Sequence, residues 1–486
     1  MQWISLYLPN LPLEALTRSL ATPEPQAIAE HSVASHQRVV ACDRKARARG
    51  VRPGIAVSAA RALAHDLVVR PRDPAEETEA LLGVAGWAAQ FTPSVAHEPP
   101  DALVLEVSGS LKLFGGVDRM RAALLEGCAR MGFTALAACA PTARGAAWLA
   151  RAGLAPCIEH ADALESALAA LPLRIAVRAA NTLEALHAIG ARTVGDLAAL
   201  PRDGLARRFG QALLDDLDRA HGRRADPRAF YVPPAKFHAR LELPAEVTQA
   251  DSLLFAARRL FVQLEGFLAA RAGGVRRLEL RLFHREEAVT VVPIGLVAPS
   301  RAASHFTLLA RERLGTMALA APVRTLALAA DDIVPLTGEP LALFADENGR
   351  PEDWQKLVER LRARLGTASV HGVCGAAEHR PEYASRACEP PLARGKENGE
   401  GGAVGLRPFW LLAAPRPIAE VGAVPHHSGP LKLLAGPERI ESGWWDGAEA
   451  RRDYFIARTG EATLAWIYRE RGAQAGGDWF LHGLFA

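Results

Sequence analysis

Two carboxylates in one strand-like segment are the first residues whose types could perform chemistry. Residues 101–116 read DALVLEVSGSLKLFGG, with Asp101 at the start and Glu106 just before a turn of small residues. Carboxylates that converge on Mg²⁺ are the hallmark of metal-assisted phosphoryl transfer. Strand side chains alternate faces, however, and five steps of roughly 3.3 Å put these two acids about 16 Å apart on opposite faces. The two acids therefore cannot share a metal pair.

The elements that must position this segment alternate between strand and helix. A short strand over residues 3–8 is closed by Pro9 and Pro12, and helical and loop segments continue to residue 72. After the opening segment, the hydrophobic period predicts a helix over 117–131, a strand over 134–140 and a helix over 142–153. This interleaving indicates an α/β unit.

The next region, residues 171–228, has an all-helical pattern. Within it, LEALHAIGARTVGDLAALP (183–201) has the form of two short helices joined at Ile189 and Gly190. Such a turn can direct backbone N–H groups at a phosphate, with Gly190, Arg192 and Thr193 as the candidates. A plain helix-turn-helix packing unit has the same pattern.

Residues 235–330 give a more specific order. The pattern predicts strand, helix, two strands, helix and strand, which is the β-α-β-β-α-β arrangement of the ferredoxin-like split motif. A fold of this kind does not by itself define a function.

The remaining segments are a helix, a linker and an aromatic tail. An amphipathic helix is predicted over 351–366, and a flexible linker rich in Gly, Pro and charge over 371–406. Five of the nine tryptophans follow in the last 80 residues: Trp410, Trp444, Trp445, Trp466 and Trp479. This tail is expected to be a separate module, whose tryptophans fill a core or form a partner-binding face.

Composition sets the outer limits. A chain of 486 residues with 49% hydrophobic and 23% charged residues is expected to form at least three globular units. No segment has the pattern of a signal peptide or the length of a membrane span, so a cytoplasmic protein is expected. Six cysteines are scattered without a disulfide framework, as suits a reducing compartment. Four residues, His371, Cys374, His379 and Cys388, could be interpreted as a zinc cluster. Because their spacing is irregular, we favour the interpretation that they are unrelated loop residues.

The net charge of +3 becomes informative where cations cluster. Residues 43–52 hold five cations in ten residues, and residues 207–228 hold a second group. Both lie beside apolar periodicity, so each is either a solvated helix face or a surface for nucleic-acid phosphate. The candidates in the first cluster are Arg44, Lys45, Arg47 and Arg49.

Several motifs together resemble a known family. In chain order, ARARGVRPGIAVSAARAL, LEVSGSLKLFGG, CAPTARGAAWLARAG, and LHAIGARTVGDLAAL followed by RRFG resemble segments of the Y-family (DinB-like) translesion DNA polymerases. The N-terminal LYLPNLPLEAL, EHRPEYA at 378–384 and the aromatic tail resemble, more narrowly, the polymerase-like member of bacterial mutagenesis cassettes. The resemblance covers almost the whole chain apart from the linker.

The resemblance implies a multidomain α/β and α+β fold with the subdomains of those polymerases. The expected ranges are palm 1–10 and 73–165, fingers 11–72, helical thumb 166–233, ferredoxin-like little finger 234–335, clamp-binding peptide 338–346, and a Trp-rich partner-binding module 407–486. The clamp-binding peptide would be Pro340, Leu341, Leu343 and Phe344, with Pro340 where the family has Gln.

The resemblance also implies which carboxylates should hold metal. The family takes one from the first strand and an adjacent Asp-Glu pair from a later strand. Here the first strand has no acid, Asp101 aligns with the Asp of the pair, and Ala102 replaces its Glu, while Glu106 takes a structural position before the turn. In the nucleotide pocket Arg47 matches a family arginine, but Ala143 and Ala147 replace two lysines. Asp101 is then either a weak ion ligand or a solvated strand-end carboxylate.

We therefore expect a polymerase homologue that is not an enzyme and needs no cofactor, and that acts as a scaffold in translesion synthesis. The implied partners are DNA, the sliding clamp, a RecA-like protein and a DnaE-type polymerase that performs the chemistry. Two alternatives stay open: a slow polymerase that uses Asp101 as a metal ligand, and a DNA-binding module without a clamp role.

Overall fold

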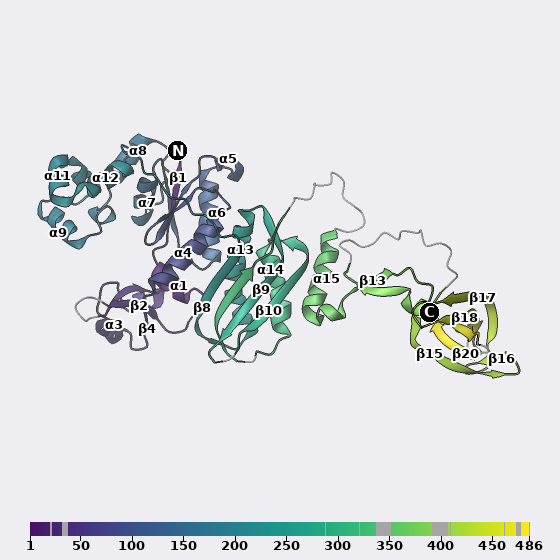
Figure 1. Ribbon diagram of the computed structural model, residues 1–486. Helices are drawn as coiled ribbons and strands as arrows, with labels where there is room; N and C mark the ends of the chain where they lie inside the picture. The colour runs from purple at the N-terminus through teal and green to yellow at the C-terminus, as the bar shows by residue number, and fades with distance from the viewer. Residues whose placement is uncertain are drawn as a thin grey trace. The chain divides into compact units, whose positions relative to one another are not determined.

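The computed structural model describes the chain except for residues 20–21, 32–36, 287, 320, 337–350, 391–406, 409, 461, 473–477 and 486. It divides into two compact units, Met1–Ala345 and Asp346–Ala486 (Figure 1). The candidate clamp peptide, Pro340 to Phe344, lies outside the described residues. No helix in the described ranges is both long enough and apolar enough to cross a membrane.

A four-stranded antiparallel sheet forms the centre of the first unit. Its strands, in the spatial order β5-β6-β1-β7, are β5 (Val95–Glu98), β6 (Ala102–Glu106), β1 (Trp3–Tyr7) and β7 (Leu136–Ala140). The surrounding helices are α1 (Leu11–Thr17), α4 (Pro74–Ala88), α5 (Leu111–Phe114), α6 (Val117–Arg130) and α7 (Ala143–Arg151). Since α7 is largely buried and packs on β1, β6 and β7, it covers one face of the sheet.

A small subdomain is inserted between α1 and α4. It pairs β3 (Gln37–Cys42), β2 (Gln26–His31) and β4 (Val68–Pro71), and adds α2 (Arg44–Ala48) and α3 (Val57–Leu63). Its core of small aliphatic residues is separate from that of the main sheet. The predicted range 11–72 contains this subdomain together with α1.

A helical subdomain follows the sheet. It consists of α8 (Ala161–Ala169), the 3₁₀ helix η1 (Leu173–Ile175), α9 (Ala180–Ala188), α10 (Val194–Ala199), α11 (Arg202–Phe209) and α12 (Gln211–Ala220). These helices share one continuous apolar core with α7 and the covered face of the sheet. The all-helical pattern predicted for 171–228 is confirmed as far as Ala220, where α12 ends, and residues 221–228 are not helical.

The last part of the first unit has the predicted β-α-β-β-α-β order. The elements are β8 (Phe237–Val247), α13 (Ala250–Ala269), β9 (Gly273–His284), β10 (Thr290–Ser300), α14 (Ala303–Gly315) and β11 (Val323–Ala330). The sequence did not predict β12 (Ile333–Pro335), which pairs with the start of β9. We refer to this part as the split-motif subdomain.

Close packing at two glycines joins the split-motif subdomain to the sheet subdomain. Trp87 of α4 lies between Gly127 of α6 and Gly266 of α13, where an added Cβ would come within 1.9 Å and 2.2 Å of the indole. A side chain at either position would overpack this contact. The two subdomains are therefore held at a distance that only glycine permits.

The second unit begins with α15 (Pro351–Leu365) and η2 (Thr367–Ser369). The flexible linker predicted over 371–406 is wrong in its first half, because β13 (Gly372–Gly375), η3 (Pro381–Tyr383) and β14 (Ser385–Cys388) form an ordered hairpin. A disulfide joins Cys374 to Cys388, so the expectation of unpaired cysteines and the zinc interpretation both fail there. The amino-acid composition did not predict this hairpin, because the disulfide and contacts with a later sheet stabilise it.

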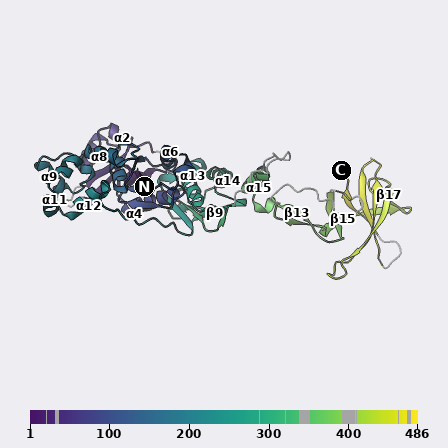
Figure 2. The same ribbon diagram turned by 90° about the horizontal axis from the view of Figure 1, so that it is seen from above.

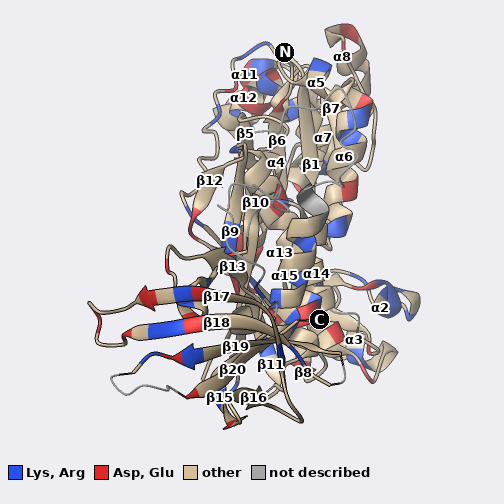
Figure 3. Cartoon of the chain, turned by 90° about the vertical axis from the view of Figure 1, so that its right-hand side faces the viewer, with Lys and Arg blue, Asp and Glu red and all other residues tan. Residues whose placement is uncertain are grey.

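That sheet, part of which is labelled in Figures 1 and 2, has six antiparallel strands. Their order is β16-β15-β20-β19-β18-β17 (Figure 3). The strands are β15 (Trp410–Val421), β16 (Val424–His426), β17 (Lys432–Ser442), β18 (Ala450–Arg458), β19 (Leu464–Glu470) and β20 (Trp479–Leu484). Arg380 of the hairpin is buried against it and contacts Asp446 Oδ2 at 2.6 Å and the Ala448 carbonyl at 3.0 Å. The predicted separate tail module thus includes the hairpin.

Candidate functional site

The pairing register defines the residues at one end of the central sheet. Glu98 of β5 lies opposite Ala102 of β6, Ala102 lies opposite Tyr7 of β1, and Tyr7 lies opposite Leu136 of β7. Directly paired residues on antiparallel strands point to the same face. Ala102, which replaces the expected glutamate, is therefore flanked by Glu98 and by the phenol of Tyr7.

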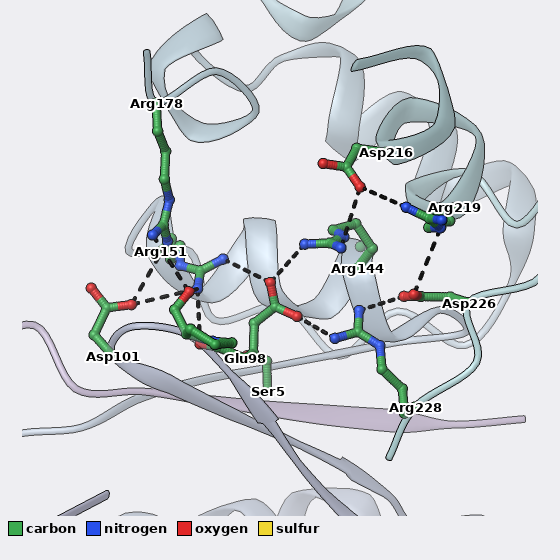
Figure 4. Close-up of polar contacts among 12 residues, drawn as sticks. Ser5, Glu98, Asp101, Arg144, Arg151, Arg178, Asp216, Arg219, Asp226 and Arg228 are labelled. Carbon is green, nitrogen blue, oxygen red and sulfur yellow. Dashed lines mark hydrogen bonds and ion pairs between the residues drawn. The ribbon is translucent and has the colours of Figure 1, made fainter. Parts of the chain in front are cut away.

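Glu98 is the buried charge at this end of the sheet. Its side chain is 5% exposed and contacts three guanidinium groups (Figure 4). Arg144 Nη1 donates to Glu98 Oε1 at 2.7 Å, Arg151 Nη1 donates to the same oxygen at 3.4 Å, and Arg228 Nη1 donates to Oε2. Arg144 and Arg151 both project from α7, which explains why the helix that covers this face brings cations to it.

The arginines determine the protonation state of Glu98. Burial alone would raise the pKa of this carboxyl, but the charges of Arg144, Arg228 and Arg151 outweigh burial and hold the pKa below its ordinary value. Glu98 is therefore ionised at neutral pH, and its charge is compensated by guanidinium groups.

Asp101 also lies against arginines. Its Oδ1 is 3.4 Å from Nη2 of Arg151 and 3.8 Å from Nη2 of Arg178, which precedes α9. Arg151 Nη2 also donates to the carbonyls of Glu98 and Pro99, at 3.2 Å each. Arg151 thus bridges the two acids that flank the β5–β6 turn.

A second set of ion pairs extends the network into the helical subdomain. Asp216 of α12 accepts from Arg144 at 3.2 Å and from Arg219 at 3.1 Å, and Asp226 contacts Arg228. Figure 4 shows the chain of contacts from Asp101 to Asp226. Five arginines and four carboxylates therefore connect the sheet to the helices that follow it. Breaking one partner of a buried pair is strongly destabilising.

The donor set does not fit the Mg²⁺ pair that the resemblance implies. Two-metal sites hold the ions about 4 Å apart and need several free carboxylate oxygens as ligands. Here Asp101 and Glu98 are each engaged by guanidinium groups, Ala102 has no ligand atom, and burial followed by the charge of Asp101 raises the pKa of Tyr7 and keeps the phenol protonated. Among the described residues, no group of three or more His, Cys, Asp or Glu side chains is arranged to hold a metal.

Glu106 has the structural position that was expected. Its Oε1 accepts a hydrogen bond from the Ser108 N–H at 3.1 Å, and its backbone carbonyl accepts from Thr92 Oγ1 at 2.7 Å. The carboxylate therefore fixes the turn after β6. It lies at the opposite end of that strand from Ala102.

The first basic cluster lies on and around α2, where the ribbon in Figure 3 is coloured for Lys and Arg. Arg47 Nη2 donates to Asn10 Oδ1 at 3.0 Å, Lys45 Nζ donates to the carbonyls of Thr22 and Pro23, and Arg49 forms an ion pair with Asp66. The side chain of Arg44 makes no hydrogen bond or ion pair within the described ranges. Three of the four candidates therefore already have partners inside the chain.

The turn at Gly190 also uses its own hydrogen-bonding groups. Gly190 has a φ of +93°, and its N–H donates to the His187 carbonyl at 3.1 Å. The N–H groups of Arg192 and Thr193 both donate to Asp196 Oδ2 at 2.9 Å, in a capping box at the start of α10. The Arg192 and Thr193 amides therefore bond a carboxylate of the same turn, and phosphate contact at Gly190, Arg192 and Thr193 stays a prediction.

The tail tryptophans divide into two groups. Trp410, Trp444 and Trp445 are 71%, 76% and 58% exposed, as a partner-binding face requires. Trp479 is 6% exposed, belongs to the apolar core and donates to Glu420 Oε2 at 3.1 Å, so its assignment to the binding face is wrong. Trp466 is also a core residue, stacked on Tyr454.

Sequence reasoning missed Glu98 and its arginines. The nearest signal was the glutamate inside the segment SVAHEPPD (94–101), two residues before Pro100. Its partners Arg144, Arg151 and Arg228 are 46, 53 and 130 residues away. Only the fold brings them together.

Comparisons with known proteins agree with this architecture. A family model described as the impB/mucB/samB family matches residues 12–152, which include β5, β6, β7 and α7. The class is that of the Y-family polymerase homologues. Protein ImuB of Caulobacter vibrioides (strain NA1000 / CB15N) is 30% identical over 466 residues, covering 90% of this chain and 100% of that protein, and ImuB of strain ATCC 19089 / CIP 103742 / CB 15 gives the same values. The chain belongs to the ImuB family.

Solved structures give a weaker likeness. The insertion ternary complex of Dbh DNA polymerase is 15% identical, with a TM-score of 0.39 over 69% of this chain and 99% of that chain. DinB from Sulfolobus solfataricus is 15% identical, with a TM-score of 0.38 over 69% of this chain and 100% of that chain.

The Glu98→Gln variant tests the network. It leaves buried guanidinium groups without their counter-charge, so we expect it to lower the free energy of unfolding in urea by about 3 kcal/mol. Because the folded-state pKa of Glu98 is depressed, its contribution is complete above the unfolded pKa of about 4.3 and is lost as the pH falls through the folded value. In the Glu98→Gln variant, the free energy of unfolding should therefore fall less steeply than in the wild type as the pH is lowered below about 4.3.

The matched control is Glu126→Gln on α6, an exposed residue that removes the same charge. We expect it to change stability by less than about 0.5 kcal/mol. If the two variants lowered the free energy of unfolding equally, the charge of Glu98 would not be needed to stabilise the buried arginines.

Proposed function

We propose that this protein is a catalytically inactive polymerase homologue that acts as a scaffold in error-prone translesion DNA synthesis. The observation that carries the proposal is the engagement of Asp101 and Glu98 by arginines beside Ala102. Polymerase chemistry requires metal ions that neutralise the transferring phosphoryl group and align the attacking oxygen. Guanidinium groups contact both oxygens of Glu98 and Oδ1 of Asp101, and the remaining Oδ2 of Asp101 provides too few ligands for two such ions.

The scaffold role rests on family membership and on the elements outside this site. By resemblance to the proteins of mutagenesis cassettes, the partners would be DNA, the sliding clamp, the RecA-like protein ImuA and a DnaE-type polymerase. The exposed Trp410, Trp444 and Trp445 would provide a docking face in the second unit. Several weak contacts joined by linkers raise the local concentration of an active enzyme at a lesion. We expect this to occur in the bacterial cytoplasm at the nucleoid.

DNA contact is also part of the proposal, with Arg44, Lys45, Arg47 and Arg49 as the first candidates. Arg44 is the strongest of them, since it lacks a partner within the described residues. Contacts of this kind hold phosphate without reading base sequence.

The proposed inactivity predicts the outcome of a primer-extension assay. With a primed template, all four deoxynucleotides and either Mg²⁺ or Mn²⁺, the intact protein should add no nucleotide, while an active Y-family polymerase extends the primer under the same conditions. The alternative function, a slow polymerase that uses Asp101, predicts measurable extension. Extension that persists in Glu126→Ala but disappears in Asp101→Ala would establish that alternative and end the scaffold proposal.

Clamp binding is tested separately by pull-down with the bacterial sliding clamp. We expect Leu343→Ala combined with Phe344→Ala to abolish capture, because an apolar cleft binds these two side chains. The control combines Asp346→Asn with Glu347→Gln in the same segment and should retain capture. If the wild-type protein is not captured, or if the double alanine variant binds equally well, the protein is a DNA-binding module without this clamp contact.

A further inference from the structure

A groove in the first unit has features that the proposed function does not use. It lies where α13 and α14 pack together beside the end of α6, and it encloses about 450 Å³. Clefts of roughly 300–1,000 Å³ are typical of ligand sites. The groove is lined by Arg130, Arg258, Val262, Ala303, Ser304, Thr307, Leu308 and Arg311.

Helical spacing explains how these side chains come to line one groove. Arg258 and Val262 are four residues apart on α13, and Ser304, Thr307, Leu308 and Arg311 follow the i, i+3, i+4, i+7 pattern on α14. Residues at these spacings share a helix face. The two faces meet along the packed pair of helices, and Arg130 at the C-terminal end of α6 closes one side.

The rim of the groove carries uncompensated positive charge. Arg258 and Arg311 are exposed and form no ion pair with any residue that the structure describes. Arg130 is 50% exposed and lies 3.3 Å from Glu265, whose other oxygen accepts the Ala303 N–H at 3.0 Å. An exposed pair of this kind contributes little and leaves Arg130 able to exchange partners.

The floor of the groove is apolar. Val262 is 5% exposed, Ala303 is 3% exposed and the side chain of Leu308 is half-buried. A phosphate backbone gains nothing from such a floor, whereas a peptide can place an aliphatic side chain on it and direct carboxylates at the rim. Arginine forms bidentate hydrogen bonds with carboxylates and is enriched where interfaces have their strongest contacts.

We propose that this groove binds an acidic peptide segment of a partner protein, with an aliphatic anchor on Val262 and Leu308 and carboxylates on Arg258, Arg311 and Arg130. The groove belongs to the first unit, so it is a docking site distinct from the tryptophan face of the second unit. The inference goes beyond the scaffold proposal and does not depend on catalytic inactivity. Because its test measures binding alone, its failure leaves the primer-extension result unaffected.

The test is a fluorescence-anisotropy titration of the full chain with a fluorescein-labelled peptide of alternating Glu-Glu and Leu-Leu pairs. We expect saturable binding that weakens with salt, because charge complementarity contributes to it. Arg258→Glu combined with Arg311→Glu should reduce the affinity at least tenfold. A peptide of the same length with Ala in place of Leu should bind several-fold more weakly, since it lacks the anchor.

The matched control is Arg276→Glu combined with Arg324→Glu, which makes the same change of net charge. Both residues are exposed on strands β9 and β11 of the same subdomain and have no ion pair with a described residue. The control should bind the peptide like the wild type. Thermal unfolding of all variants checks that they are folded.

Three outcomes would overturn the proposal. The wild type does not bind the Glu/Leu peptide, or the control variant loses binding as completely as the groove variant. The third outcome concerns a single-stranded oligothymidylate probe. If this probe prevents peptide binding and its affinity falls only in the groove variant, the groove binds nucleic acid. Loss of peptide binding in the groove variant alone supports it.

Discussion

The buried charge of Glu98 is the constraint on which the first unit depends. A carboxylate that is 5% exposed needs counter-charges, and α7 and the segment after α12 provide them through Arg144, Arg151 and Arg228. The same arginines reach Asp101, Asp216 and Asp226, so one set of ion pairs stabilises the sheet edge and joins it to the helical subdomain. A buried network of this kind is costly to interrupt at any member. It also fixes the chemistry of the edge, because each acid there has a guanidinium partner.

If the proposed inactivity holds, this network gives a physical account of how a polymerase-like sheet is stabilised without bound metal ions. Loss of an acidic ligand leaves the remaining carboxylates close together, and without a cation their mutual repulsion raises their pKa values. The arginine side chains from α7 provide this positive charge, and they stay protonated throughout the physiological pH range. The register of β1, β5 and β6 places Tyr7 and Glu98 opposite Ala102, beside this network. The protein can then present its surfaces, including the exposed tryptophans and the arginine-lined groove, on a stable frame.

The sequence predicted the elements whose hydrophobic period is regular. The alternation in β6, the amphipathic helices from α8 to α12 and the β-α-β-β-α-β order are local signals, and the structure has them. The alignment of Asp101 and Ala102 with the Asp-Glu pair of the family also identified the end of the sheet where the glutamate of that pair is replaced. Contacts between distant residues were not predictable in this way. Glu98 with Arg228, the hairpin closed by Cys374 and Cys388, and the burial of Trp479 all depend on which segments the fold brings together.

The central claim is that Asp101 and Glu98 are compensated by arginines and do not hold divalent metal ions. A direct test is an electron paramagnetic resonance titration of the intact protein with Mn²⁺, which reports bound ions without any requirement for polymerase activity. The account predicts that the wild type and the Asp101→Asn variant give the same signal, with no saturable site that depends on Asp101. A saturable Mn²⁺ site in the wild type that disappears in Asp101→Asn would contradict it.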